Sequence, residues 1–88
     1  VDFRVSGRVQ GVSFRAWTQR EAEARALAGW VRNTADGSVE GRVQGAQAAV
    51  DGMLAALHDG PPAARVDSVA HQETDPDPET GTAMRILR

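Results

Sequence analysis

The segment from Gly7 to Gly11, taken together with Arg15, contains residue types that can bind a phosphate group. The two glycines of Gly-Arg-Val-Gln-Gly let the backbone turn sharply, so that successive N–H groups can approach an anion closely. Arg15 follows shortly afterwards, and its guanidinium stays charged at any relevant pH and matches phosphate oxygens with two parallel donors. The pattern indicates a phosphate cradle, but it is also compatible with a plain strand-to-helix turn.

The same pentapeptide occurs again at residues 41–45. At the position that corresponds to Arg15, this second copy has Ala49, which carries no charge. We therefore place the phosphate at the first copy and interpret the second as part of a hairpin and helix start. Neither copy has the spacing of a P-loop or of a dinucleotide-binding fingerprint.

Asn33 is the second residue that could take part in chemistry. It precedes Asp36-Gly37, a dipeptide typical of tight hairpins. A carboxamide donates and accepts hydrogen bonds without titrating, so it could orient a water molecule. Asn is also a common turn residue, and its type alone leaves both interpretations open.

Other conspicuous side chains have simpler interpretations. Trp17 and Trp30 are expected to be core aromatics, and His58 and His71 surface residues rather than general bases. The acidic, proline-containing segment 73–79 lacks the ligand spacing of a cation site and is interpreted as a solvated loop.

The elements that position these residues are predicted from periodicity and turn signals. Alternating apolar residues predict strands, and a clean helical stripe predicts the second helix. The predicted order is strand 1–6, helix 13–28 ended by Gly29, strand 30–34, strand 39–43, helix 46–57 stopped at Gly60, strand 65–71 and strand 83–87. This order predicts an α+β, ferredoxin-like (βαββαβ) sandwich in one domain spanning 1–88: an antiparallel sheet, two helices on one face and a short extra C-terminal strand.

The composition excludes several classes of function. A net charge of −2 argues against nucleic acid as the main partner, since binding a phosphate backbone needs a clustered positive excess. The chain has no cysteine, which excludes disulfides, thiolate nucleophiles and structural zinc clusters of cysteine. It shows no signal peptide and no apolar run long enough to span a bilayer. We expect a cytoplasmic protein with no nucleic-acid or membrane partner.

Three segments together carry a family resemblance: Val5–Arg15 (VSGRVQGVSFR), Gly29–Glu40 (GWVRNTADGSVE) and Gly60–Val66 (GPPAARV). In this order and spacing, the chain resembles the acylphosphatase family over nearly its whole length. The resemblance implies metal-independent hydrolysis of acyl phosphates to a carboxylate and inorganic phosphate, with no cofactor. It implies that Arg15 binds the phosphate, that Asn33 positions the attacking water, and that the cradle is the backbone of Arg8, Val9, Gln10, Gly11 and Val12. We expect a monomer whose site also accepts inorganic phosphate or sulfate.

Three departures from the family pattern affect packing and stability more than chemistry. Trp17 replaces a Tyr, Arg25-Ala26 replaces Leu-Gly, and Met84 replaces a Phe. The alternative function is a non-catalytic acylphosphatase-like accessory or small-ligand-binding domain, such as the N-terminal module of hydrogenase-maturation carbamoyltransferases. An RNA-binding domain of the same topology would need exposed aromatics on its two central strands together with basic charge. Residues 1–5 offer only Phe3, and residues 39–43 offer no aromatic side chain.

Overall fold

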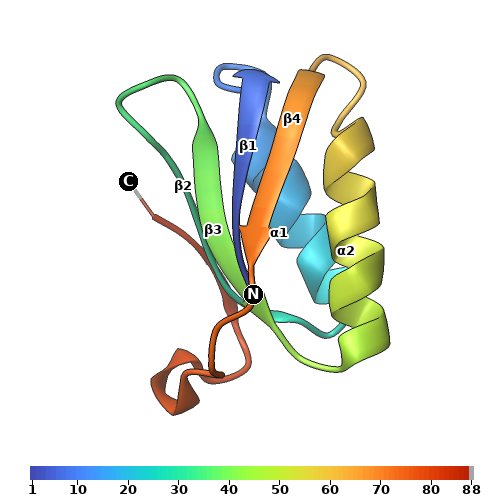
Figure 1. Cartoon of the computed structure of the whole chain (residues 1–88), viewed down its shortest axis with the longest axis vertical. Coiled ribbons are helices and arrows are strands. Elements are labelled where there is room, and N and C mark those ends of the chain that lie inside the picture. Colours follow the sequence, from blue (N-terminus) through green and yellow to red (C-terminus); the bar gives the residue numbers. More distant parts are fainter. Residues whose placement is uncertain (88) are drawn as a thin grey trace.

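Two helices cover one face of a five-stranded sheet in the computed structural model, which describes residues 1–87 (Figure 1). The elements are β1 (Asp2–Arg8), α1 (Phe14–Ala24), β2 (Ala28–Asn33), β3 (Val39–Gln44), α2 (Gln47–Asp59), β4 (Arg65–Gln72), a 3-10 helix (Pro78–Thr80) and β5 (Met84–Ile86). The strand order is β4-β1-β3-β2-β5. The predicted ferredoxin-like α+β fold is confirmed.

The last strand makes the sheet mixed rather than purely antiparallel. β1 pairs antiparallel with β3 and β4, and β2 pairs antiparallel with β3. β5 pairs parallel with β2, with Gly29 opposite Met84. After β4, the chain passes beneath the sheet to its opposite edge and enters at the end where β2 begins (Figure 1). β5 therefore runs in the same direction as β2.

The core lies between the sheet and the helices. Alternate residues of the central strands point into it, as the period of a half-buried strand requires, and α2 contributes one apolar stripe. Its fully buried side chains include Val5, Val31, Val39, Val43, Phe14, Met53 and Leu57. Met84 also enters this core and is 3% exposed, and Trp17 packs against Phe14 with ring centroids 5.3 Å apart.

Two sequence-based boundaries are wrong near the first glycine segment and at the end of α1. β1 continues through Arg8, because after a register shift at Ser6/Gly7 it still pairs with β4. The connecting turn is therefore residues 9–13 rather than 7–11. The second pentapeptide lies mostly within β3.

Helix α1 ends at Ala24, and Gly29 does not terminate it but belongs to β2. Gly29 has φ +147°, and a Cβ there would lie 1.8 Å from the carbonyl oxygen of Arg42. This glycine therefore allows β3 to approach closely. The helix is ended by Ala26, at φ 56°, whose N–H donates to Glu23 O while Leu27 N–H donates to Ala22 O. These two bonds form a Schellman motif around a left-handed residue.

We expect Ala26→Gly to stabilise the protein. A left-handed backbone strains alanine by about 1–2 kcal/mol, and the greater freedom of glycine in the unfolded chain offsets part of the gain, leaving about 0.5–1 kcal/mol. Urea unfolding measures this difference. The matched control is Ala24→Gly, in the exposed last turn of α1, which should destabilise by a similar amount. An Ala26→Gly protein that unfolds at or below the native urea midpoint contradicts this account of the helix end.

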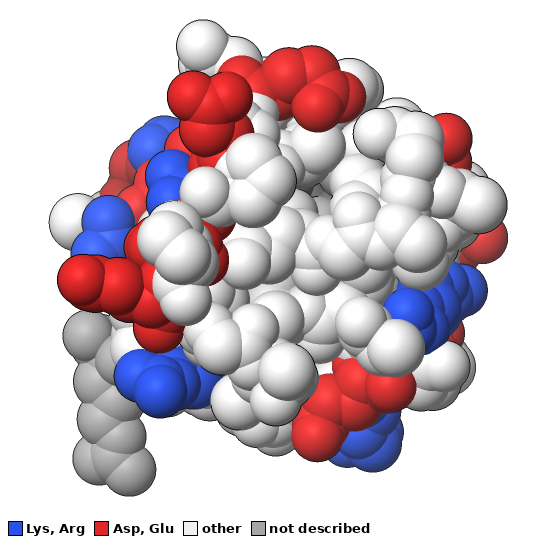
Figure 2. All heavy atoms as spheres, turned by 90° about the horizontal axis from the view of Figure 1, so that it is seen from below, with Lys and Arg blue, Asp and Glu red and all other residues white. Residues whose placement is uncertain are grey.

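The described surface carries charges of both signs. Figure 2 shows the face seen from below, where acidic and basic side chains are mixed around the rim of an uncharged centre. Within residues 1–87, no helix combines the length and the apolar composition needed to cross a bilayer.

Candidate active site

The turn between β1 and α1, residues 9–13, presents backbone N–H groups that other protein groups do not use. Val9 anchors it and is 1% exposed. Gly11 and Ser13 have left-handed backbones, with φ 75° and 62°, a kind of conformation in which successive N–H groups can converge on an anion. Within residues 1–87, no N–H of residues 10–13 donates a hydrogen bond to a protein group. The turn can therefore accept an oxyanion without breaking existing bonds.

The start of α1 adds to this donor surface. Ser13 is the N-cap residue, and its side chain makes no capping hydrogen bond. The unpaired N–H groups of a helix's first turn carry partial positive charge and favour an anion. At Gly11, an added methyl group would meet no atom within 4 Å, so the backbone borders open space. A ligand can approach the turn directly.

A pocket of about 370 Å³ opens at this turn. It brings together Arg15, the second residue of α1, and Asn33, the last residue of β2. The remainder of α1 and most of β2 separate these two residues in the sequence. The lining consists of Val9, Gly11, Ser13, Phe14, Arg15, Ala16, Asn33 and Ile86.

Arg15 lines the pocket and also touches the C-terminal segment. Its Nη1 donates to the carbonyl oxygen of Leu87 at 3.3 Å. None of the ion pairs within the described part of the chain uses Arg15. Its guanidinium is thus held beside the pocket by a neutral acceptor.

Asn33 is half-buried and lines the same pocket. It forms no side-chain hydrogen bond with any group of residues 1–87. It can therefore both donate to and accept from a water molecule in the pocket.

Three residues of the predicted cradle do not line the pocket. Arg8 is the last residue of β1 and borders a separate groove with Arg65. Val12 packs partly against the core, and Gln10 directs its side chain to the β2–β3 hairpin. A contribution of these residues to phosphate binding through the backbone stays a prediction.

Four of the lining residues are not among those predicted from the sequence. Ser13, Phe14 and Ala16 flank Arg15, so their proximity to it was the available signal. Ile86 had no such signal, because only the parallel pairing of β5 with β2 brings it to this wall. His58 and His71 are exposed and lie outside the pocket. Residues 1–87 contain no group of three metal-ligating side chains.

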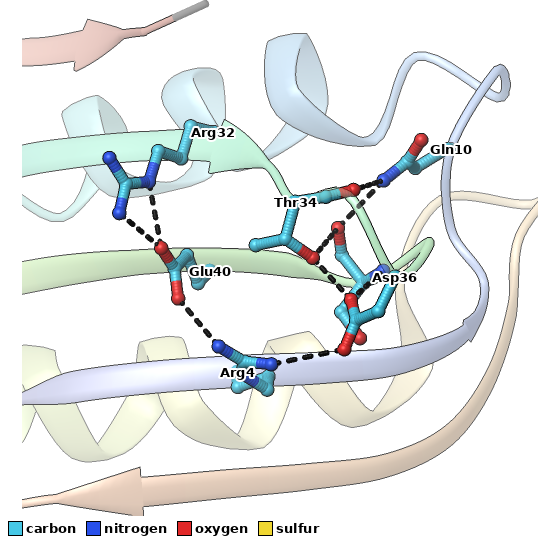
Figure 3. Close-up of polar contacts among 7 residues, drawn as sticks. Arg4, Gln10, Arg32, Thr34, Asp36 and Glu40 are labelled. Carbon is cyan, nitrogen blue, oxygen red and sulfur yellow. Dashed lines mark hydrogen bonds and ion pairs between the residues drawn. The ribbon is translucent and has the colours of Figure 1, made fainter.

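The hairpin after Asn33 contains a strongly hydrogen-bonded carboxylate (Figure 3). Asp36 accepts from the hydroxyl of Thr34 and, at 3.0 Å, from the N–H of Ser38. The Thr34 bond, followed by those from Ser38 and a smaller effect of Arg4, lowers the pKa of Asp36 from 3.8 to about 2. The hairpin is therefore organised around the ionised carboxylate.

This lowered pKa predicts an acid dependence of stability. The pKa is below its unfolded value, so the contribution of Asp36 is complete above about pH 4 and is lost as pH falls through about 2. The stability difference between the native chain and Asp36→Asn should therefore be constant above pH 4 and shrink between pH 4 and 2. Urea midpoints measured from pH 2 to 7 test this. A difference that does not change with pH contradicts it.

Comparisons with known proteins all identify the same family. The family model described as acylphosphatase matches residues 1–84. An acylphosphatase of Rhodospirillum rubrum is 56% identical over 66 residues, which are 75% of this chain and 72% of the relative. One of Rhizobium meliloti is 48% identical over 85 residues, 97% of this chain and 88% of the relative. The crystal structure of acylphosphatase from Bacillus subtilis superimposes with a TM-score of 0.91 at 36% identity, covering 99% of this chain and 96% of that one.

Proposed function

Because the chain belongs to the acylphosphatase family, we propose that it hydrolyses the carboxyl-phosphate bond of acyl phosphates in the pocket shared by Arg15 and Asn33. One observation carries the assignment of the site. A single pocket is lined by Gly11 and Ser13, whose N–H groups donate to no protein group within residues 1–87, together with Arg15 and Asn33. These are the groups needed to hold a tetrahedral anion and a water molecule together.

The reaction breaks the bond between phosphorus and the carboxyl oxygen. Water attacks phosphorus in line with that bond, and the products are a carboxylate and inorganic phosphate. A carboxylate is a good leaving group, so no covalent nucleophile or strong acid is needed. Catalysis then consists of positioning and electrostatic stabilisation, as in phosphoryl transfer generally.

Each group has one task in this scheme. The N–H groups of the turn and the guanidinium of Arg15 bind the three non-bridging oxygens, and they are already in place before the reaction. Asn33 holds the water on the side opposite to the leaving carboxylate. A phosphate oxygen of the substrate takes the proton of that water, so the site requires no separate general base.

The apolar lining suits the acyl part of the substrate. Val9, Phe14 and Ile86 line the same pocket as the polar groups. Ile86 is 37% exposed, as is Leu87 beside it. An acyl group placed against Ile86 covers apolar surface there, and the phosphate stays at the turn.

The enzyme works without a metal or a cofactor, because fixed donors take the place of a metal in neutralising the phosphate. It acts as a monomer in the cytoplasm and does not bind nucleic acid, in keeping with its net charge of −2. Inorganic phosphate and sulfate compete for the site.

Hydrolysis of benzoyl phosphate with and without EDTA tests this function. We expect turnover that the chelator does not change and that inorganic phosphate inhibits competitively. Loss of turnover in EDTA, with recovery on adding a divalent cation, would show that the metal-independent scheme is wrong.

A non-catalytic accessory domain is not favoured. The chain keeps the pocket with both polar side chains, and it covers 88% and 96% of the two acylphosphatases from R. meliloti and B. subtilis. Absence of any hydrolysis of benzoyl phosphate, while inorganic phosphate still binds, would restore this alternative.

A further inference from the structure

The side chain of Gln10 leaves the phosphate-binding turn and reaches the β2–β3 hairpin (Figure 3). Its Nε2 donates to the carbonyl oxygen of Thr34 at 2.8 Å and to that of Ser38 at 2.9 Å. A carboxamide nitrogen has two N–H donors, so both are used. One side chain thus joins the turn to the residue that directly follows Asn33.

The hairpin end that Gln10 contacts, residues 34–38, is a unit whose residues are hydrogen-bonded to one another. The N–H of Thr34 donates to Ser38 O at 2.9 Å, and Asp36 accepts from both residues. From β1, Arg4 donates to Asp36 at 3.1 Å (Figure 3). A displacement of this unit would move the adjoining end of β2, and with it Asn33.

The turn has no other polar connection to this unit. Within residues 1–87, the two bonds of Gln10 are the only hydrogen bonds between residues 9–13 and residues 34–38. The N–H groups of residues 10–13 point to no protein acceptor. The spacing between the turn and the hairpin therefore depends on Gln10 in addition to the burial of Val9 and the pairing of β1 and β2 with β3.

We propose that Gln10 is a positioning residue that sets the distance between the phosphate held by the turn and the water held by Asn33. This inference rests on the proposed function. In-line attack is sensitive to the separation of the reacting atoms, and a misplacement of about 1 Å can cost on the order of 10²-fold in rate. Gln10 itself does not line the pocket, so it acts through the groups that it connects.

The variant that tests this role is Gln10→Met, which keeps the length of the side chain and removes both donors. Both carbonyl oxygens keep another donor, Gly37 N–H for Thr34 and Thr34 N–H for Ser38, so the change leaves neither of them unpaired. Gln44→Met is the matched control. Gln44 also makes two hydrogen bonds, to the N–H and carbonyl oxygen of Asp77, at 2.9 Å each and outside the pocket.

The experiment is a double-mutant cycle of Gln10→Met with Asn33→Ala, read as kcat for benzoyl phosphate and as inhibition by inorganic phosphate. We expect Gln10→Met alone to lower kcat about tenfold and to change the phosphate inhibition constant less than about threefold. In the Asn33→Ala background it should lower kcat no further, because the water is no longer held. Gln44→Met should leave kcat within about twofold.

Equal losses of kcat from Gln10→Met in both backgrounds would overturn the proposal, as would an unchanged kcat. If Gln10→Met does not fold by circular dichroism, Gln10→Leu, which also lacks both donors and adds no charge, replaces it in the cycle under the same criteria. The two proteins of the cycle that keep Gln10, the native chain and Asn33→Ala, test the proposed function separately. An inactive native chain, or an Asn33→Ala protein with full activity, locates the failure in that function and removes the basis for a positioning role.

Discussion

Replacing Arg15 by alanine is expected to lower kcat/KM for benzoyl phosphate by at least the order of 10²–10³. The guanidinium lies in the pocket next to the open amides of the 9–13 turn. Its removal takes away the only arginine that lines this pocket within residues 1–87. In the proposed scheme the guanidinium contacts the phosphate before and during the reaction, so inhibition by inorganic phosphate should weaken as well.

Arg15→Lys should not restore this activity. An ammonium group keeps the charge but lacks the planar pair of N–H donors that matches phosphate oxygens. Arg20→Ala is the control, since Arg20 is an exposed residue of the same helix outside the pocket. The kcat/KM of this variant should stay within about twofold of the native value. An Arg15→Ala enzyme with nearly native kcat/KM would show that the phosphate binds elsewhere.

Replacing Asn33 by alanine is expected to lower kcat on the order of 10²-fold while leaving phosphate affinity nearly unchanged. The carboxamide has no hydrogen-bond partner within residues 1–87 and faces the same pocket as Arg15. If its task is to orient the water, its loss affects the transition state and not the binding of the phosphate group. Steady-state kinetics and inhibition by inorganic phosphate separate these two effects.

Two further variants sharpen the result for Asn33. Asn33→Asp keeps the shape but introduces a carboxylate that repels a bound phosphate, so it should also weaken inhibition by phosphate. Gln47→Ala removes an exposed amide of α2 and should change neither kcat nor the inhibition by inorganic phosphate. A kcat of Asn33→Ala within about twofold of the native value contradicts the role in water positioning.

The residues with the strongest local signals were predicted well. The alternation in β1 and β3 identified the buried faces, and the stripe with Val50, Met53 and Leu57 identified the inner face of α2. The dipeptide Asp36-Gly37 marked the hairpin between β2 and β3. Residue type and spacing indicated Arg15, whereas the resemblance to the acylphosphatase family selected Asn33, and the structure brings both into one pocket.

Other features could not be predicted, because they depend on which distant segment lies opposite a residue. Gly29 looks like a helix stop in the sequence, but its conformation is required by the approach of β3, and Ala26 ends the helix instead. Gln10 has the same local sequence whether its amide faces the pocket or the hairpin. Only the packed structure places the two carbonyl oxygens within its reach.

The order and type of the elements follow from the local periodicity of apolar side chains and from turn propensities, so they could be predicted from the chain alone. The side chains that can perform the chemistry were indicated by residue type and by the family motifs. The tertiary structure decided the rest: the parallel placement of β5, which brings Ile86 to the pocket, and the joining of the turn to the hairpin through Gln10. Those arrangements follow from strand pairing and core packing between segments far apart in the chain, and no local pattern encodes the free energy of such contacts.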